Sequence, residues 1–523
     1  MEVLPDDVLF IIFGTYRVIS PLHWHRLAHV CRRWRNIVFA SPRALDLRLY
    51  CKPGTPVMKT LECWPVLPIV VQYRVCQVVG SPTPEDEDNV LAALKHSDRI
   101  CSISLVVTRS LLKKLGTSVQ SFPELEDLVL LCRSDPYMPF PPNFRWGTCL
   151  RSLDLTGISL SSLPQLLSAS PNFVNLQLHD IVSARQLLPQ TFASALSGVT
   201  LLQSLSLHFH VLFQYTHRDT PPFSEERVVF PALTYIKIRG IKNSYLNNFI
   251  ARIDVPHLAE IEIMIIYQPN IDVSPFVQFI DRIEKQKSHS RADILTSGCA
   301  ISMSLSRPQA PSRLKIGICC RELDEQLSSM ARICNDFSQS LLGVRDLRIE
   351  TTQKSGRWGG TAVENWFELL SWFRGAGRLY IAGDSELAAD ILRALRPLLA
   401  RFGEFTSGAL PALTNLYVIG PMSGLLQDIV QSIIALRKLS DSPIVGRVDV
   451  NSRDNKIICL TERQDLIRHS NCRAPSQECE ELCRYCHAPW QLCRSISRER
   501  RLRQRPQPSN IELSDLFPSQ TPP

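Results

Sequence analysis

The sequence predicts an α/β repeat protein with a short all-α module at its N-terminus and a disordered tail at its C-terminus. Three observations support this prediction. The first forty residues carry apolar side chains at helical spacing. A short apolar pattern typical of stacked strands then recurs through the middle of the chain. Residues 498–523 are rich in arginine, proline, serine and glutamine, a composition that favours disorder.

We expect four segments along the chain. They are the helical module at 1–50, a linker and first helix at 51–97, a repeat solenoid at 98–450 with a polar insertion at about 285–313, and a cysteine-rich segment with a basic, proline-rich tail at 451–523.

The helical module is predicted from two apolar runs. The first follows Leu4-Pro5 and contains Val8, Leu9, Ile12 and Phe13. The second contains Trp24, Leu27, Cys31, Trp34 and Val38, whose offsets of 3 and 4 place them on one helix face. About forty residues cannot easily bury this much apolar surface alone. We therefore expect the surplus to contact a partner protein.

These runs resemble an F-box. The resemblance rests on the Leu4-Pro5 start, on Val30-Cys31-Arg32-Arg33-Trp34 and on the end at Ser41-Pro42. Residues 45–68 are similar to the expanded F-box/leucine-rich-repeat proteins of mushroom-forming fungi. The resemblance implies docking on the Skp-type adaptor of a cullin-based SCF ubiquitin ligase. The residues that it assigns to this docking are Leu4, Pro5, Val8, Leu9, Ile12, Phe13, Leu27, Val30, Cys31, Trp34 and Val38. The alternative is an ordinary helical hairpin that packs on the rest of the protein.

The solenoid is predicted from apolar residues at positions 1, 4 and 6 of a repeating unit, often again at 9. One unit contains Leu150, Leu153, Leu155 and Ile158, and another contains Leu233, Ile236, Ile238 and Ile241. The spacing is close to the leucine-rich-repeat template, in which stacked units form a parallel ladder. Residues 285–313 are polar and basic and include Pro308 and Pro311, so we expect a loop or insertion there. The alternative is a generic α/β domain whose strands share this spacing.

A cysteine-rich segment precedes the tail. Cys479, Cys483, Cys486 and His487 have ligand types and spacing that suit zinc, but the two separated Cys-x2-Cys pairs of a zinc ribbon are missing. We therefore favour a ligand-free segment and expect no metal and no other cofactor. Zinc binding by these four residues is the alternative.

Composition and motifs favour a binding protein over an enzyme. The sequence has no Walker-type glycine loop, no Gly-x-Ser-x-Gly and no His-Glu-x-x-His. Five arginines of the tail account for much of the net charge of +8, so we expect no nucleic-acid partner. An acidic start without a signal peptide and scattered cysteines indicate an intracellular protein, in the cytoplasm, the nucleus or both, and we expect no membrane contact.

These observations together predict the function of the chain. We expect a non-catalytic subunit that binds the adaptor of an SCF ligase through the F-box and an unknown protein substrate through the repeats. The alternative is a leucine-rich-repeat scaffold outside a ligase.

Overall fold

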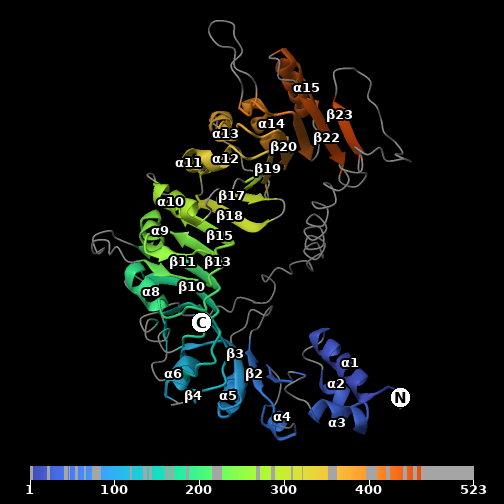
Figure 1. The fold of residues 1–523 in the computed structure, drawn as a ribbon, viewed down its shortest axis with the longest axis vertical. Helices are drawn as coiled ribbons and strands as arrows, with labels where there is room; N and C mark the ends of the chain where they lie inside the picture. Colours follow the sequence, from blue (N-terminus) through green and yellow to red (C-terminus); the bar gives the residue numbers. More distant parts are fainter. Residues whose placement is uncertain are drawn as a thin grey trace, which may run out of the picture.

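A computed structural model of the chain shows a small N-terminal helical module followed by a long, mostly parallel sheet with helices along one of its sides (Figure 1). The structure describes residues 4–19, 24–40, 45, 47–52, 57–63, 66–73, 84–117, 121–132, 138–140, 144–159, 163, 167, 170–183, 188–214, 227–266, 271–283, 289–307, 310–320, 322–351, 362–383, 385–395, 409–419, 424–439, 444–451 and 456–460. The cysteine-rich segment from 461, the zinc candidates in it and the tail lie outside these residues.

The helical module (residues 4–40) consists of α1 (Asp6–Ile19), α2 (His25–Ala28) and α3 (Arg32–Ala40). Asp6 and Asp7 begin α1, where carboxylates favour the positive end of the helix dipole. The backbone N–H of Trp34 donates to Cys31 Sγ (3.4 Å) at the start of α3. The Phe13 and Trp34 rings, 4.9 Å apart, pack α1 against α3. Two predicted apolar runs thus form three helices around a common core.

The sheet begins directly after this module. Its first ten strands form an unbroken ladder of nine parallel pairings. In spatial order they are β1 (Leu49–Cys51), β2 (Ile69–Tyr73), β3 (Ile100–Val106), β5 (Asp127–Leu131), β8 (Ser152–Thr156), β10 (Asn175–Ser183), β11 (Ser204–Gln214), β13 (Tyr235–Ile241), β15 (Glu260–Ile266) and β18 (Ala310–Cys319).

The ladder starts earlier than the sequence indicated. Residues 51–97, expected to form a linker and one helix, contain β2 between α4 (Val57–Cys63) and α5 (Pro84–Leu94). Ile69, Val71 and Tyr73 of β2 are buried, so this strand shares the core of the repeats that follow. The solenoid therefore begins near Leu49 rather than at 98, because two short strands precede the first full repeat pattern.

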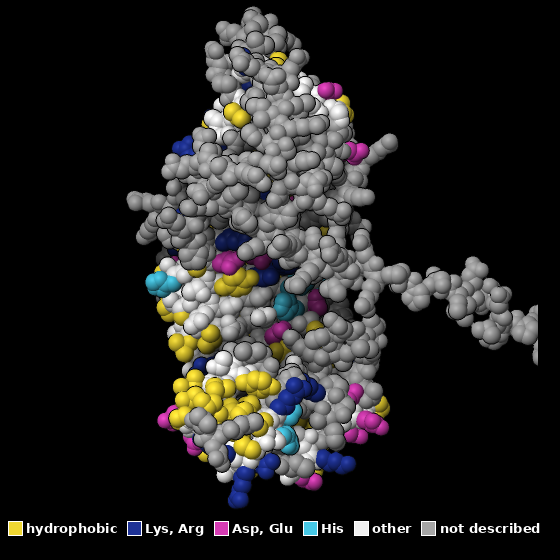
Figure 2. Space-filling view, turned by 90° about the vertical axis from the view of Figure 1, so that its right-hand side faces the viewer, with side chains coloured by type: hydrophobic (Ala, Val, Ile, Leu, Met, Phe, Trp, Pro, Cys, Tyr) yellow, Lys and Arg dark blue, Asp and Glu magenta, His cyan; other side chains and the backbone are white. Residues whose placement is uncertain are grey.

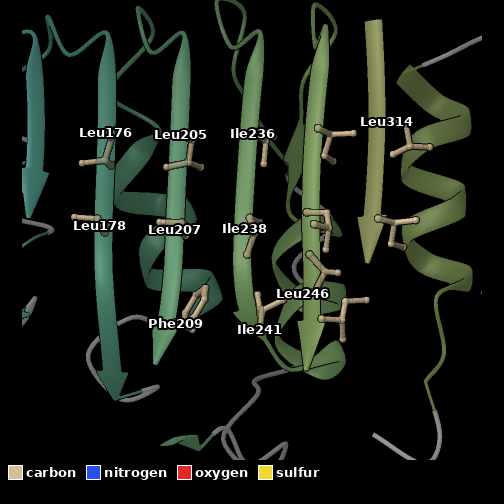
Figure 3. Close-up of a cluster of buried hydrophobic side chains, with 14 of the residues drawn as sticks. Leu176, Leu178, Leu205, Leu207, Phe209, Ile236, Ile238, Ile241, Leu246 and Leu314 are labelled. Carbon is tan, nitrogen blue, oxygen red and sulfur yellow. The ribbon is translucent and has the colours of Figure 1, made fainter. Parts of the chain in front are cut away.

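The predicted repeat positions form the core between sheet and helices. Leu176, Leu205 and Ile236 are paired across β10, β11 and β13, and the next inward row contains Leu178, Leu207 and Ile238 (Figure 3). All six side chains are buried, and burying each stabilises the fold by about 1.5–3 kcal/mol. This arrangement confirms the leucine-rich-repeat-like solenoid.

An antiparallel hairpin interrupts the parallel ladder. β16 (Arg291–Ser297) pairs antiparallel with β17 (Ala300–Arg307), which pairs antiparallel with β18. β16 then pairs in parallel with β19 (Asp346–Thr351). We expected a loop or insertion at about 285–313, and residues 291–307 form an insertion of two strands within the sheet itself rather than a loop. Ile301, Met303 and Leu305 of β17 are buried and alternate with serines, as in a strand with one polar face.

The sheet continues beyond β19 to its C-terminal edge. β20 (Arg378–Ala382), β21 (Asn415–Ile419) and β22 (Val445–Asn451) extend it in parallel, and β23 (Lys456–Leu460) adds an antiparallel strand. Short pairs join β4 (Ser121–Phe122) to β7 (Arg145–Trp146), β6 (Met138–Pro139) to β9 (Ile158–Ser159), and β12 (Val228–Val229) to β14 (Ile253–Asp254).

Helices follow the strands along the array. They are α6 (Arg109–Thr117), α8 (Pro189–Leu196), α9 (Asn243–Ile250), α10 (Ser274–Ile283), α11 (Leu323–Asp336), α12 (Ser338–Leu341), α13 (Ala362–Leu370), α14 (Ser385–Ala394) and α15 (Gly424–Leu439). None of the helices in the described chain has the length and hydropathy needed to span a bilayer.

Candidate functional site

The apolar side chains of helix α1 are divided between a buried face and an exposed face. Leu9 and Phe13, four residues apart, are buried in the core of the helical module. Val8, Ile11 and Ile12 are exposed, with Ile11 at 68% of its full accessible area. Leu4, just before α1, is also exposed and lies one turn before Val8 in sequence. The outward side chains therefore form an apolar stripe that the chain itself does not cover.

The start of α3 lies against the segment that precedes α1. Arg33 Nη2 donates to the Leu4 carbonyl oxygen (2.6 Å), and Arg33 Nε donates to Asp6 Oδ1 (2.9 Å). These bonds hold the Leu4-Pro5 segment next to the turn that carries Val30 and Cys31, both exposed. In the sequence, Arg33 stood out only as part of the F-box motif, because the spacing within one helix does not show a contact with another segment.

The docking surface of the module is defined here as Leu4, Pro5, Val8, Ile11, Ile12, Val30 and Cys31, all of which are exposed. Figure 2 shows hydrophobic side chains gathered at the end of the molecule where Figure 1 places α1–α3, with Lys, Arg and His side chains beside them. Such a rim of polar side chains around an apolar centre is typical of protein–protein interfaces.

The eleven residues that the F-box resemblance assigned to docking fall into two groups. Leu4, Pro5, Val8, Ile12, Val30 and Cys31 lie on the docking surface, whereas Leu9, Phe13, Leu27 and Val38 are buried and Trp34 is half-buried. Leu9 and Phe13, expected as contact residues, are core residues in this structure. Ile11 was missed, since its apolar character alone does not tell which way it points.

Exposed apolar side chains are concentrated in this module. Of the 13 large hydrophobic residues that are exposed among the described residues, Leu4, Val8, Ile11, Ile12 and Val30 lie within residues 4–30. The other eight are distributed between Met58 and Val445. Scattered surface apolar residues are ordinary, but a cluster indicates an interaction site.

The open face of the sheet is a second candidate surface, and it is polar. It is formed by strand residues that alternate with the buried ones, such as Lys237, Glu262 and Lys315. Glu262 carboxylate oxygens lie 2.6 Å from Arg239 Nη2, 3.2 Å from Lys315 Nζ and 3.5 Å from Lys237 Nζ. Burial alone would raise the pKa of Glu262. The hydrogen bond from Arg239 and the charges of Lys315 and Arg239 outweigh burial and lower this pKa to about 2.

The open face also carries two neighbouring histidines, whose rings lie 6.0 Å apart at positions 179 and 208. Burial lowers the pKa of His208, against the opposing effect of the Asp180 carboxylate. Within the ranges that the structure describes, no three His, Cys, Asp or Glu side chains gather in a way that could hold a metal ion. The zinc alternative rests on residues beyond those ranges and stays a prediction.

Comparisons with known proteins give results for both regions. Residues 1–48 match a family model described as F-box-like, which identifies the helical module as an F-box-like domain. No curated protein matches the chain. Nine chains of solved structures match it. One is the leucine-rich-repeat-containing protein LegL7 from Legionella pneumophila, 12% identical, with a TM-score of 0.28 and coverage of 75% of this chain and 98% of that chain.

Proposed function

We propose that this chain is the substrate-recognition subunit of a cullin-type SCF E3 ubiquitin ligase. In this proposal the F-box-like domain binds the Skp-type adaptor, and the sheet binds a protein substrate. The observation that carries the proposal is the uncovered docking surface in a domain that matches the F-box-like model. Removing the exposed part of these apolar side chains from water would favour association with a partner.

The proposed adaptor contacts are the seven residues of the docking surface. Leu9, Phe13, Leu27, Trp34 and Val38 support the contact from within, because they fix the relative positions of α1 and α3. Arg33 holds the Leu4-Pro5 segment through its hydrogen bonds to the Leu4 carbonyl oxygen and to Asp6. A surface whose side chains are already positioned loses little conformational entropy on binding.

The chain contributes proximity rather than chemistry in this proposal. A substrate held on the sheet is carried into the ligase through the F-box-like domain, which raises its effective concentration at the ubiquitin-charged enzyme. No catalytic residue is required of this chain, so we propose that it is not an enzyme. The need for a cullin and its adaptor would place it in the cytoplasm or nucleus. We also propose a relation to the expanded fungal proteins, which is supported by residues 45–68 of the sequence.

Co-purification with a Skp-type adaptor tests the docking step. Val8→Glu/Ile12→Glu places two charges on the docking surface without changing a buried residue, and it should abolish co-purification. Leu201→Glu/Leu425→Glu is the matched control, since both side chains are exposed in the solenoid and lie outside the module. The control should bind like the unchanged protein, and unaffected binding by the Val8/Ile12 variant would refute the assignment.

A reconstituted ligase separates this proposal from a scaffold outside a ligase. With adaptor, cullin and charged enzyme present, ubiquitylation of proteins retained by the array should depend on this chain. It should stop with Val8→Glu/Ile12→Glu and continue with the control variant. Adaptor binding without any ubiquitylation of a retained protein would favour the scaffold.

A further inference from the structure

Three neighbouring strands carry a cluster of cations around one carboxylate on the open face of the sheet. The cluster consists of Lys237 and Arg239 on β13, Glu262 on β15 and Lys315 on β18. Lys237 and Lys315 are the direct register partners of Glu262 on its two sides. Arg239 lies two residues further along β13 on the same face and donates to Glu262. All three cations therefore converge on one carboxylate.

This cluster has an excess of positive charge that the neighbouring ion pairs lack. Elsewhere on the open face, Arg291 pairs with Asp293 (2.9 Å), Arg348 with Glu350 (3.0 Å) and Arg378 with Asp346. Those pairs are one cation to one carboxylate, whereas three cations share Glu262. The adjacent row of paired residues, Tyr235, Glu260 and Arg313, adds one negative and one positive charge. The net charge of the cluster with this row therefore remains +2.

The excess charge is accessible from solvent. The side chain of Glu262 is only 10% exposed, while those of Lys237, Arg239 and Lys315 are 29%, 45% and 26% exposed. Glu262 is therefore largely shielded from solvent, while each of the three cations keeps part of its side chain exposed. Figure 2 shows Lys or Arg side chains beside Asp or Glu side chains in the middle of the strand side of the molecule. An anion that binds here would relieve the repulsion among three like charges.

Small side chains flank the cluster on both sides. Ser206 of β11 is the register partner of Lys237, and Ser304 of β17 is the register partner of Lys315. Ser302 of β17 lies opposite Gly317, and the side chain of Met264 on β15 fills the space next to this glycine. Ser206, Ser302 and Ser304 are themselves buried, so an approaching peptide would meet the partly exposed cations rather than the serine hydroxyls.

We propose that this cluster binds an acidic segment of the protein substrate, with its carboxylates spread along an extended chain. Glu262 already fills the point on which the three cations converge, so a single compact anion could not occupy it. Lys237 and Lys315 lie two strand spacings apart, about 10 Å. An extended peptide in the polyproline II conformation has three residues per turn and a rise of about 3.1 Å per residue, so it places residues i and i+3 on the same side at about 9 Å. Carboxylates at this spacing would therefore meet the two lysines, with Arg239 beside them.

The proposal deepens the proposed function, since it names the class of segment that the ligase subunit would recognise. Its test is a binding titration of the full-length chain by fluorescence anisotropy. The probe is a labelled peptide with glutamate at every third position and serine between, and its glutamine counterpart is the control probe. Binding of the glutamate probe should weaken at least about tenfold between 0.05 and 0.5 M salt, because exposed charges are screened.

Matched variants locate the binding. Lys237→Gln/Lys315→Gln should weaken binding of the glutamate probe at least about tenfold. Lys237→Arg/Lys315→Arg keeps the charges and should bind within about twofold of the unchanged protein. Arg291→Gln/Arg348→Gln removes the same charge from one-to-one pairs on the same face and should also stay within about twofold. Thermal unfolding of each variant checks that it is folded. The salt dependence of probe binding is measured on the unchanged protein, so it tests the proposal even if a variant does not fold.

The outcomes either support or overturn the proposal. If Arg291→Gln/Arg348→Gln weakened probe binding as much as Lys237→Gln/Lys315→Gln, the probe would be attracted to the whole face and not to the cluster around Glu262. This result would refute the proposal. Equal binding of the glutamine probe, or binding of a phosphoserine peptide alone, would refute the carboxylate assignment. Adaptor binding measured on the same preparations separates the two proposals. Adaptor binding without probe binding refutes only this inference, and probe binding without adaptor binding refutes only the ligase role.

Discussion

The helical module and the open face of the sheet offer partners two different kinds of surface. The module exposes aliphatic side chains, among them Val8, Ile11 and Ile12, on one side of a single helix. The open face of the sheet exposes charged side chains, and many of the described ones form ion pairs with each other. Both regions bury their cores completely, with Phe13 and Ile238 as examples. The difference therefore lies in what is left outside the core.

This difference predicts two kinds of association. Burial of apolar surface gives a contact that depends little on salt and carries a negative change in heat capacity. Charge complementarity gives a contact that salt weakens and that discriminates between partners by repulsion. A constant adaptor suits the first kind of surface, and exchangeable substrates suit the second.

The largest expected effect is on the core of the module. Phe13→Ala should destabilise α1–α3 by about 3–5 kcal/mol, since Phe13 is fully buried against Trp34. Ile11→Ala, on the outward face of the same helix, should change stability by less than about 0.5 kcal/mol. Hydrogen exchange of the module reports both values. Equal effects of the two substitutions would show that α1 does not have one buried and one free apolar face.

The next effect concerns the cluster around Glu262 and its dependence on pH. Because the pKa of Glu262 is lowered from 4.5 to about 2 in the folded chain, its carboxylate stabilises the fold at neutral pH. This contribution should be lost as the pH falls from about 4.5 towards about 2. Glu262→Gln should cost roughly 2–3 kcal/mol at neutral pH and progressively less below pH about 4.5.

Hydrogen exchange of β15 measures that difference. Glu260→Gln is the control, since Glu260 lies on the same strand and face, and it should change stability by less than about 0.5 kcal/mol. A Glu262→Gln penalty that stays constant from pH 7 to about 2.5 would contradict the role of the three cations.

A smaller effect on stability is expected when a glycine of each region is replaced by alanine. Gly240 in β13 has φ +71°, and a Cβ there would lie 2.2 Å from the Phe209 carbonyl oxygen. Gly240→Ala should therefore destabilise the sheet by roughly 2 kcal/mol. Gly14 lies in α1 with open space around its Cβ position. Gly14→Ala should stabilise the module by about 0.5–1 kcal/mol. Thermal unfolding should show shifts of opposite sign, and a destabilising Gly14→Ala would contradict the open helix surface.

The smallest effect concerns the anchor of the Leu4-Pro5 segment. Arg33→Gln removes its bonds to Leu4 and Asp6, but both charged side chains are partly exposed, so the stability change should stay below about 1 kcal/mol. Adaptor affinity should fall by up to about fivefold, because the segment is less well positioned before binding. Arg32→Gln is the control on the exposed neighbour. A titration that shows equal losses for both variants would refute the anchoring role.

The parts of the fold that the sequence predicted are those in which one periodicity dominates. The repeat positions from Leu125 to Val418 were identified because strands leave a two-residue alternation that later units copy. β17 has the same alternation in Ile301, Met303 and Leu305, but it is antiparallel and followed by Pro308. It matches no repeat unit, so the polar residues around it indicated a loop or insertion and not a strand of the sheet.

The docking surface shows a different limit of the sequence. Leu9 and Val8 are adjacent, equally apolar and both compatible with a helix face, yet one is buried and the other exposed. Only the position of α3 decides between them, and that position depends on contacts such as Phe13 with Trp34. The residue types at the site were therefore predictable, whereas their division between core and surface was not. The cluster around Glu262 likewise requires the register of three strands that lie far apart in sequence.

Calorimetric titration of a Skp-type adaptor into the full-length chain tests most directly whether the outward face of α1 is the docking site. We predict binding with a negative change in heat capacity and an affinity that changes less than about threefold between 0.1 and 0.5 M salt. Val8→Glu/Ile12→Glu should weaken this binding at least about 100-fold, and Leu201→Glu/Leu425→Glu should leave it unchanged. Equal affinities for these two variants would contradict the account.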